Sequence, residues 1–374
     1  MTLSYSTLST LADRVFTFMI ADHGGHADPV IRNAADCHAG DWGMDIHHWD
    51  WNPGVGLIAM SAYYGAGRDE KVQACLREWV RNNAHKRNDI QAVNATAPFC
   101  ILPDLYWWTE DPAYKDMALA WGDWVLDHAH RTQAGALQHT VNSAASYDKL
   151  KDQVWADTIF MAVLFLAKLT RLTGNTAYVR EALRQLELHL EVLQDAETGV
   201  LFHGYDCATG DHLSGARWTR GNAWLAVATP MIVEEARKAG VSASAAVLDR
   251  YDTLVRSIVK YQATNGLWHT VMDRPSFYQE SSGSAGIACG IAKAVKLGLV
   301  EASYMRYAEL GLQGVVSQIA DTGEVLSVSG GTPIMDTIED YNELTCYATL
   351  YGQGLTLMLL AEFMQERSEQ RHAL

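Results

Sequence analysis

Helical segments joined by alternately short and long connections constrain the fold of this chain more than any other feature of its sequence. Apolar residues recur at helical spacing almost throughout its 374 residues, and strand-like alternation is nearly absent. Short connections make consecutive helices antiparallel partners, and long ones join one pair to the next. The spacing predicts twelve helices, over residues 7–20, 53–66, 68–84, 96–109, 112–131, 157–173, 175–194, 219–239, 243–263, 283–298, 302–319 and 344–368.

The long connections carry a related motif, in which a glycine precedes apolar residues and, three times, a histidine. The four copies are GALQH at 135–139, GVLFH at 199–203, GLWH at 266–269 and GEVLS at 323–327. Recurrence of two helices plus a long loop is typical of a helical array. Six such units account for residues 1–374, which we expect to form a single domain.

An array of six helix pairs can form an open solenoid or a closed ring. A solenoid needs terminal repeats with a polar outer face, whereas both terminal helices here have broad apolar faces. We therefore expect an all-α fold, an (α/α)6 toroid or six-hairpin barrel with six inner and six outer helices. All long loops would then share one rim, the expected functional face.

Composition and charge narrow the classes of function. The formal net charge of −15 argues against a nucleic acid or an anionic membrane as partner, and the sequence has no run apolar enough to span a bilayer. The N-terminal stretch lacks a basic n-region, so we expect a helix of the fold there and not a signal peptide. Six scattered cysteines without a CxxC pair favour reduced thiols and a cytoplasmic protein. Since the sequence shows no obvious interface stripe, we expect a monomer or a small homo-oligomer.

Aromatic and titratable side chains lie at the ends of the long loops, where a toroid would bring them together. The chain has 12 Trp and 16 Tyr, whose rings stack on the apolar faces of sugars. The candidates are Trp49, Trp51, Asn94, His139, Trp155, Asp157, His203, Arg217, Arg220, Trp224, His269 and Glu280. Each has a structural alternative, such as a loop cap, an ion pair or stacking of Trp224 on Arg220 at i+4. As a set they resemble an aromatic cleft for a negatively charged sugar, with Arg220 and the histidines as counter-charge.

Asp157 begins the most apolar predicted helix, two residues after Trp155. One interpretation is a helix N-cap, whose carboxylate accepts the N–H groups of the first turn. The other is a catalytic acid at the mouth of a cavity, with the Trp155 ring as a sugar platform. Ordinary glycoside hydrolysis needs two carboxylates, and Glu280 and Asp89 are the weaker candidates for the second.

Signatures of other chemistries are absent from the sequence. It contains no GxSxG, no P-loop and no GxGxxG after a strand. The HHWD stretch at 47–50 lacks the spacing of a zinc site. We therefore expect neither a metal nor a cofactor.

Three motifs together resemble the unsaturated rhamnogalacturonyl hydrolases of glycoside hydrolase family 105, which are relatives of the unsaturated glucuronyl hydrolases. They are QVWADTIFMAVLFLAKLTRLTG at 153–174, DAETGVLFHGY at 195–205 and GARWTRGNAW at 215–224. The resemblance extends from about Trp49 to beyond Glu280, over most of the chain. It implies a six-hairpin toroid, in agreement with the fold expected from the repeats.

The resemblance also implies a reaction. The family acts on lyase products that end in a 4,5-unsaturated uronic acid, and it hydrates the vinyl ether instead of hydrolysing the glycosidic bond directly. By this likeness Asp157 protonates C4 and then, as carboxylate, takes a proton from the water that attacks C5. The resulting hemiketal opens by itself, so one carboxyl group suffices. Such an acid needs a raised pKa, which burial beside Trp155 favours and a helix start opposes.

Other positions follow from the resemblance one at a time. His139 and His203 match histidines that contact substrate, while Trp155, Arg220 and Trp224 match residues around the unsaturated ring and its carboxylate. Many family members have an aspartate before the fourth helix that faces the catalytic one. Here the segment reads NDIQAVNATAP, and the nearest residue is Asn94, or Asp89 in a shifted alignment. An asparagine could bind a sugar hydroxyl but could not raise the pKa of the catalytic aspartate by charge repulsion.

The sequence therefore predicts a cytoplasmic, metal-free hydrolase of a small oligosaccharide with an unsaturated uronic acid, foremost unsaturated rhamnogalacturonan disaccharide. Three alternatives stay open. The first is an unsaturated glucuronyl hydrolase of another lyase-degraded polysaccharide. The second is a sugar 2-epimerase that uses two rim histidines on a similar toroid, and the third is a sugar-binding module without catalysis.

Overall fold

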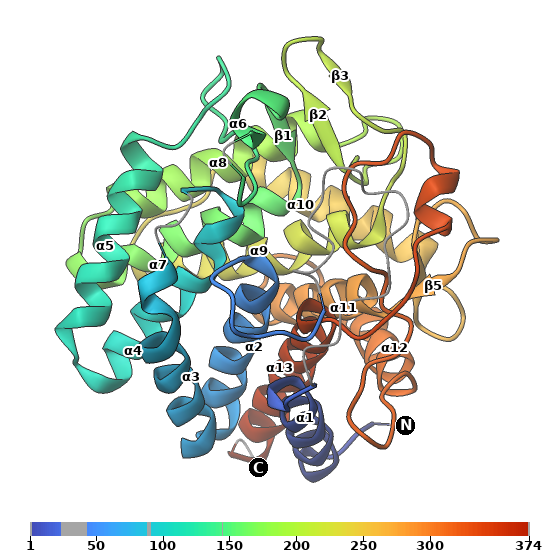
Figure 1. Cartoon of the computed structure of the whole chain (residues 1–374). Coiled ribbons are helices and arrows are strands. Elements are labelled where there is room, and N and C mark those ends of the chain that lie inside the picture. The colour runs from blue at the N-terminus through green and yellow to red at the C-terminus, as the bar shows by residue number, and fades with distance from the viewer. Residues whose placement is uncertain (1, 24–42, 88–90, 144, 373–374) are drawn as a thin grey trace.

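Twelve long helices form two concentric layers in the computed structural model, which describes residues 2–23, 43–87, 91–143 and 145–372 (Figure 1). The outer helices are α1 (Tyr5–Ile20), α3 (Glu70–Asn83), α5 (Pro112–Asp127), α8 (Ala177–Leu193), α10 (Ala245–Ile258) and α12 (Met305–Val316). The inner helices are α2 (Trp51–Gly67), α4 (Leu102–Thr109), α7 (Leu164–Thr173), α9 (Thr219–Lys238), α11 (Ser281–Lys296) and α13 (Leu350–His372). The 3-10 helix η2 (Asn94–Ile101) leads into α4, and the π-helix η3 (Ile159–Val163) leads into α7. Short helical turns are α6 (Ser146–Lys149), η1 (Ala84–Lys86), η4 (Val259–Tyr261), η5 (Ala302–Tyr304) and η6 (Glu339–Asn342).

Every predicted helix corresponds to one of these twelve, so the helical pattern and the alternation of loop lengths are confirmed. The largest difference is at the last helix, which was expected from residue 344 and begins at Leu350. The residues before it pair with the preceding loop, because Tyr347 N–H donates to the Val328 carbonyl and Gly330 N–H to the Thr345 carbonyl. Among the described residues no helix could span a membrane.

The inner helices form a closed ring. Each contacts the next in the order α2, η2 with α4, η3 with α7, α9, α11 and α13, and α13 returns to α2. Glycines allow the closest approaches: a Cβ on Gly290 of α11 would lie 2.1 Å from the Ala226 carbonyl oxygen of α9. At the closing contact, a Cβ on Gly354 of α13 would lie 3.1 Å from the Val55 carbonyl oxygen of α2. The toroid expected from the sequence is confirmed, and its closure depends on backbone-to-backbone packing.

The repeated loop motif is a glycine turn that packs on the next outer helix. Its four glycines, Gly135, Gly199, Gly266 and Gly323, have φ of 87°, 79°, 93° and 96°, a region that favours glycine. An added Cβ would strike Arg184 of α8, Ser257 of α10, Leu310 of α12 and Arg14 of α1, respectively. The fourth turn thus meets the first outer helix, so the same motif that joins neighbouring units also closes the outer layer.

Short strands on the rim were not predicted, since two or three residues give no alternation to detect. Strands β1 (Gln153–Trp155), β2 (Gly204–Asp206) and β3 (Asp211–His212) form one antiparallel sheet, and β4 (Trp268–His269) pairs with β5 (Gln279–Glu280). The first sheet lies at the edge of the molecule opposite the chain ends (Figure 1). Its register places Trp155 opposite Gly204, which brings the start of α7 beside the loop that carries His203.

Ion pairs between inner helices hold the end of the barrel away from the rim. Asp104 of α4 accepts hydrogen bonds from Ser61 of α2, at 2.6 Å, and from Lys168 of α7, at 2.5 Å. Its other oxygen pairs with Arg171, which also lies 3.9 Å from Glu235 of α9. These cations lower the pKa of Asp104 although burial alone raises it. Four consecutive inner helices are thereby linked through one buried carboxylate.

The turn at Gly323, which packs on α1, allows a test of how far such packing stabilises the closed ring. Replacing Gly323 by alanine is expected to destabilise the protein by several kcal/mol, because a left-handed φ costs about 1–2 kcal/mol and crowding against the Arg14 carbonyl adds about 1–3 kcal/mol. Gly174→Ala is the matched control, since Gly174 also has a positive φ of 73° but no atom within 4 Å of an added Cβ. Urea unfolding measures both. An equal decrease in the free energy of unfolding in the two variants would contradict a packing role for the turn.

Candidate active site

Asp157 and His203 meet where the sheet on the rim joins the inner ring. The pairing of β1 with β2 continues in a hydrogen bond of 3.0 Å from Ala156 N–H to the His203 carbonyl. His203 Nε2 then lies 3.4 Å from Asp157 Oδ2. The imidazole is fully buried, whereas the Asp157 side chain remains 16% exposed. Asp157 is therefore the more exposed side chain of the pair.

His139 and Trp155 form a stacked pair on the other side of Asp157. Their ring centroids are 4.4 Å apart and their planes differ by 6°. His139 Nδ1 lies 3.0 Å from the Thr158 hydroxyl, next to the aspartate in sequence. The indole also meets His203 edge-on, at 5.4 Å. The structure therefore brings His139, Trp155, Asp157 and His203 together, four of the residues singled out in the sequence.

Asp157 does not act as the helix cap that its position would favour. Its Oδ2 accepts no hydrogen bond within the described part of the chain. The residue that follows it, Thr158, immediately precedes the π-helical turn η3 and makes no side-chain cap either. Single π-helical turns occur frequently at functional sites. The carboxylate is thus left available, which favours the interpretation of a reactive group.

Glu280 takes the structural role instead. It caps α11, where its carboxylate accepts hydrogen bonds from Gly283 N–H at 2.6 Å and from Ser282 N–H at 3.2 Å. It also accepts from Ser329 N–H at 3.2 Å and is fully buried. With both oxygens occupied, this weaker candidate for a second acid is not available to a ligand. The other candidate, Asp89, lies outside the described residues.

Arg220 is buried beneath the site, with 1% of its surface exposed. Its guanidinium lies between the rings of Trp218 and Tyr351 and is 3.6 Å from Glu280. It donates hydrogen bonds to the Ser329 carbonyl at 3.1 Å, the Gly330 carbonyl at 2.9 Å and the Thr332 hydroxyl at 2.8 Å. In this structure its donors therefore hold the segment 329–332, and its positive charge acts on the site through space.

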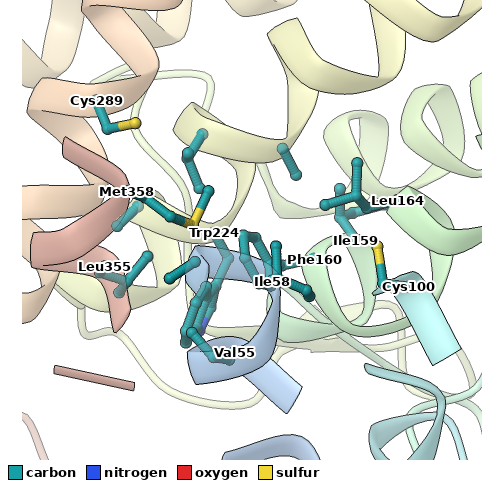
Figure 2. Packing of buried hydrophobic residues seen from close by; sticks show 14 of the residues in the cluster. Val55, Ile58, Cys100, Ile159, Phe160, Leu164, Trp224, Cys289, Leu355 and Met358 are labelled. Atoms are coloured by element: carbon teal, nitrogen blue, oxygen red, sulfur yellow. The ribbon is translucent and has the colours of Figure 1, made fainter. Parts of the chain in front are cut away.

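Two of the predicted tryptophans lie in the core and not on the rim surface. Trp224 is fully buried among the inner helices (Figure 2) and packs on Phe160, with ring centroids 4.9 Å apart. Trp49 is buried against Trp79 and Phe99. The predicted stacking of Trp224 on Arg220 is wrong, because the Trp218 ring contacts the guanidinium instead.

The remaining candidates border the site or serve the loops. Trp51 is partly exposed and stacks on Tyr351 at 5.0 Å. Asn94 begins η2 with its backbone N–H on the Thr140 carbonyl at 3.1 Å, and its buried Oδ1 has no partner among the described residues. His269 is partly buried in β4, and Arg217 pairs with Asp195 at 2.7 Å.

The charge state of the central pair follows from burial and from neighbouring charges. Burial raises the pKa of Asp157, but the facing His203, together with His139 and Arg220, lowers that pKa more, so it lies below its usual value. Burial lowers the pKa of His203, and Asp157 only partly offsets this. Burial also lowers the pKa of His139 to about 4. At neutral pH the free site therefore contains a carboxylate between two neutral imidazoles.

Tyr341 is a member of the site that the sequence did not indicate. It is fully buried in η6, and its hydroxyl lies 2.8 Å from His203 Nδ1. A tyrosine in an irregular connection has no motif around it, and 138 residues separate it from its partner. The last long loop, 320–343, is of ordinary length among the long connections, so no feature of the sequence pointed to Tyr341.

The helix directions favour an anionic ligand at the rim. All six inner helical segments begin there, with first residues Trp51, Asn94, Ile159, Thr219, Ser281 and Leu350. The N-terminal end of a helix carries a partial positive charge. Convergence of these ends creates a locally favourable potential for an anion in a protein whose net charge is −15. Among the described residues, no group of three or more His, Cys, Asp and Glu side chains is placed to hold a metal ion.

Arg220 offers a direct test of its structural role. Changing it to methionine should destabilise the fold by about 3–5 kcal/mol, because Glu280 would be left as an uncompensated buried charge. Urea unfolding measures the loss. Arg184→Met, on the exposed face of α8, should cost no more than about 1 kcal/mol. Wild-type stability combined with a higher KM would instead identify Arg220 as a substrate ligand.

Comparisons with known proteins agree with this geometry. The sequence profile of Glycosyl Hydrolase Family 88 matches residues 28–366. The unsaturated rhamnogalacturonyl hydrolase YesR of Bacillus subtilis (strain 168) is 34% identical over 325 residues, which cover 85% of this chain and 90% of YesR.

Solved structures show the same architecture. A possible member of family GH105 from Salmonella enterica serovar Paratyphi A is 30% identical, with a TM-score of 0.86 over 98% of this chain and 96% of that one. The unsaturated glucuronyl hydrolase of Bacillus sp. GL1 has a TM-score of 0.70 over 95% of this chain and 96% of its own. Its identity is 17%, so this second likeness concerns the fold alone.

Proposed function

Since the chain belongs to glycoside hydrolase family 105, the unsaturated rhamnogalacturonyl hydrolases, we propose that it removes a 4,5-unsaturated uronic acid from lyase-generated rhamnogalacturonan disaccharide. The observation that carries this proposal is the Asp157–His203 pair, 3.4 Å apart, in which the Asp157 side chain is 16% exposed and its buried Oδ2 accepts no hydrogen bond from the described residues. The name of the YesR relative supports the choice of substrate.

The reaction we propose needs one carboxyl group. Protonated Asp157 gives its proton to C4 of the unsaturated ring, and the electrons of the C4=C5 bond form the new C–H bond. Water attacks C5 and gives a proton to the Asp157 carboxylate, which restores the acid. The C5 hemiketal then opens and releases the aglycone sugar. The enclosed position of Glu280 supports a single acid, because the only other carboxylate considered within the described site is already occupied as a helix cap.

The low pKa of Asp157 in the free enzyme means that its acid form is scarce at neutral pH. Binding of a uronate brings a second negative charge to the rim, which raises the pKa of a neighbouring carboxyl group. Helix N-termini and the charge of Arg220 compensate the uronate. We propose that the substrate thereby promotes protonation of the acid that attacks it. The stacked rings of His139 and Trp155 would provide the flat surface for the sugar.

Loss of the ultraviolet absorbance of the C4=C5 enol ether tests the proposal. Wild-type protein should consume unsaturated rhamnogalacturonan disaccharide faster than disaccharides from other lyase-treated polysaccharides. Asp157→Asn should slow the reaction by about 10²–10⁴-fold, the usual contribution of a general acid–base group. Asp116→Asn, an exposed residue of α5, should leave the rate unchanged. An Asp157→Asn variant with wild-type rates would refute the role of this residue, and no turnover of any such disaccharide would refute the reaction.

The dependence of rate on pH tests whether Asp157 must be protonated before the reaction. The reacting acid must be protonated, so activity falls as pH rises through its pKa. The value of kcat/KM reports the free enzyme and kcat reports the complex. Because the pKa of Asp157 is lowered in the free enzyme and the uronate raises it, kcat/KM should decline at lower pH than kcat. Coincident profiles, or rates that increase with pH, would contradict this assignment.

A further inference from the structure

The hydroxyl of Tyr341 lies close to Nδ1 of His203, the ring nitrogen other than the one near Asp157. Tyr341 Oη lies 2.8 Å from His203 Nδ1, while His203 Nε2 lies 3.4 Å from Asp157 Oδ2. Both His203 and Tyr341 are fully buried. Apart from this close approach, Nε2 and Oδ2 have no hydrogen-bond partner within the described residues. The three side chains therefore form a chain of contacts, from the buried Tyr341 through His203 to Asp157, whose side chain is 16% exposed.

The surroundings of the Tyr341 oxygen determine which way its hydrogen points. Met335 N–H donates to this oxygen at 3.3 Å. The bond occupies an acceptor site of the oxygen and leaves the tyrosine hydrogen free to point at His203 Nδ1. Burial raises the pKa of Tyr341, which keeps the hydroxyl protonated. Nδ1 thus accepts a hydrogen bond, and the hydrogen of the neutral imidazole is on Nε2.

We propose that Tyr341 is a positioning residue, which holds His203 in the tautomer with its hydrogen on Nε2, directed at Asp157. The alternative tautomer would place the bare Nε2 lone pair against the carboxylate. This inference rests on the proposed function for its catalytic meaning, although the tautomer itself is a property of the free protein. Tyr341 touches no reacting atom and acts only through His203.

The loop that carries Tyr341 is fixed from several sides. The Tyr341 ring packs with Trp218, and the neighbouring Asn342 side chain accepts a hydrogen bond from Tyr278 N–H at 3.1 Å. The Tyr278 hydroxyl donates to the Tyr341 carbonyl at 3.3 Å. Arg220 holds the earlier part of the same loop at residues 329–332. A buried cation that does not face the ligand thereby contributes to the orientation of Tyr341.

The tautomer of His203 affects the second step of the proposed reaction, in which the Asp157 carboxylate takes a proton from water. An Nε2–H group directed at Asp157 stabilises the carboxylate form, the base that must accept a proton from water in the second step. The other charged or titratable groups that act on Asp157 are His139, from the loop after α5, and Arg220, from α9. Neither depends on Tyr341 for its charge, so removal of the Tyr341 hydroxyl isolates the contribution of His203.

Nitrogen NMR of protein labelled with ¹⁵N-histidine tests the tautomer without any substrate. His203→Gln identifies the signals of His203 by their disappearance. In the wild type, Nδ1 should have the shift of a bare nitrogen and Nε2 that of a protonated one. In Tyr341→Phe both should move toward intermediate values, because the preference between tautomers is lost. A protonated Nδ1 in the wild type, or an unchanged spectrum in Tyr341→Phe, would overturn the proposal.

The pH profile tests the effect on catalysis. Tyr341→Phe should move the decline of kcat/KM upward by about one pH unit, because the carboxylate loses a directed donor. Tyr251→Phe is the matched control: its hydroxyl is equally buried and donates to the Ala226 carbonyl at 2.9 Å, far along α9 from the site, so its profile should stay that of the wild type. A shift in Tyr251→Phe as large as in Tyr341→Phe, or none in Tyr341→Phe, would refute the positioning role. If the wild type hydrolyses no unsaturated uronide, the proposed function fails, and the NMR spectra still decide the role of Tyr341.

Discussion

The buried pair of Arg220 and Glu280 is the interaction on which the catalytic rim depends. Glu280 caps α11 and accepts from Ser329 N–H, while Arg220 of α9 holds the carbonyls of the same loop. A buried pair of this kind adds little net stability, but loss of either partner is costly. Its contribution is to specify geometry: two inner helices and the last long loop are fixed relative to one another. That loop also carries Tyr341, whose hydroxyl lies 2.8 Å from His203 Nδ1.

The fold could be predicted from the sequence because the patterns that specify it lie within short segments and recur along the chain. Helical periodicity located every long helix, and one glycine motif recurred at four of the turns onto the next outer helix. The site was predicted in part. His139, Trp155, Asp157 and His203 are joined by a short sheet between loops that the repeats had already placed on one rim. Trp49 and Trp224 show the limit, since the composition that suits a sugar platform also suits a core. Tyr341 could not be found, because its contact with His203 depends on ring closure and not on spacing along the chain.

Asp157 illustrates how local preference and function diverge. An aspartate at a helix start ordinarily accepts the first N–H groups, as Glu280 does at α11. Ahead of η3, the Oδ2 of Asp157 accepts no such bond from the described residues and lies instead 3.4 Å from His203 Nε2. A site where sequence rules agree less well than elsewhere is expected where chemistry takes place. Its neighbours His203, His139 and Arg220 also lower the pKa of Asp157 and thereby favour the carboxylate in the free protein.

Closure of the ring has a consequence for how this enzyme becomes active during folding. Asp157, the proposed catalytic acid, comes from the middle of the chain, whereas Tyr341, the residue proposed to orient His203, comes from the last long loop. A helical array can form repeat by repeat, but this site requires contacts across 138 residues, and such long-range contacts form slowly because their loop entropy is lost first. A partly formed toroid would have the acid without its oriented partner. In the proposed mechanism, full activity therefore requires the last long loop to be in place, and we expect turnover to recover on refolding only after the first and last units have met.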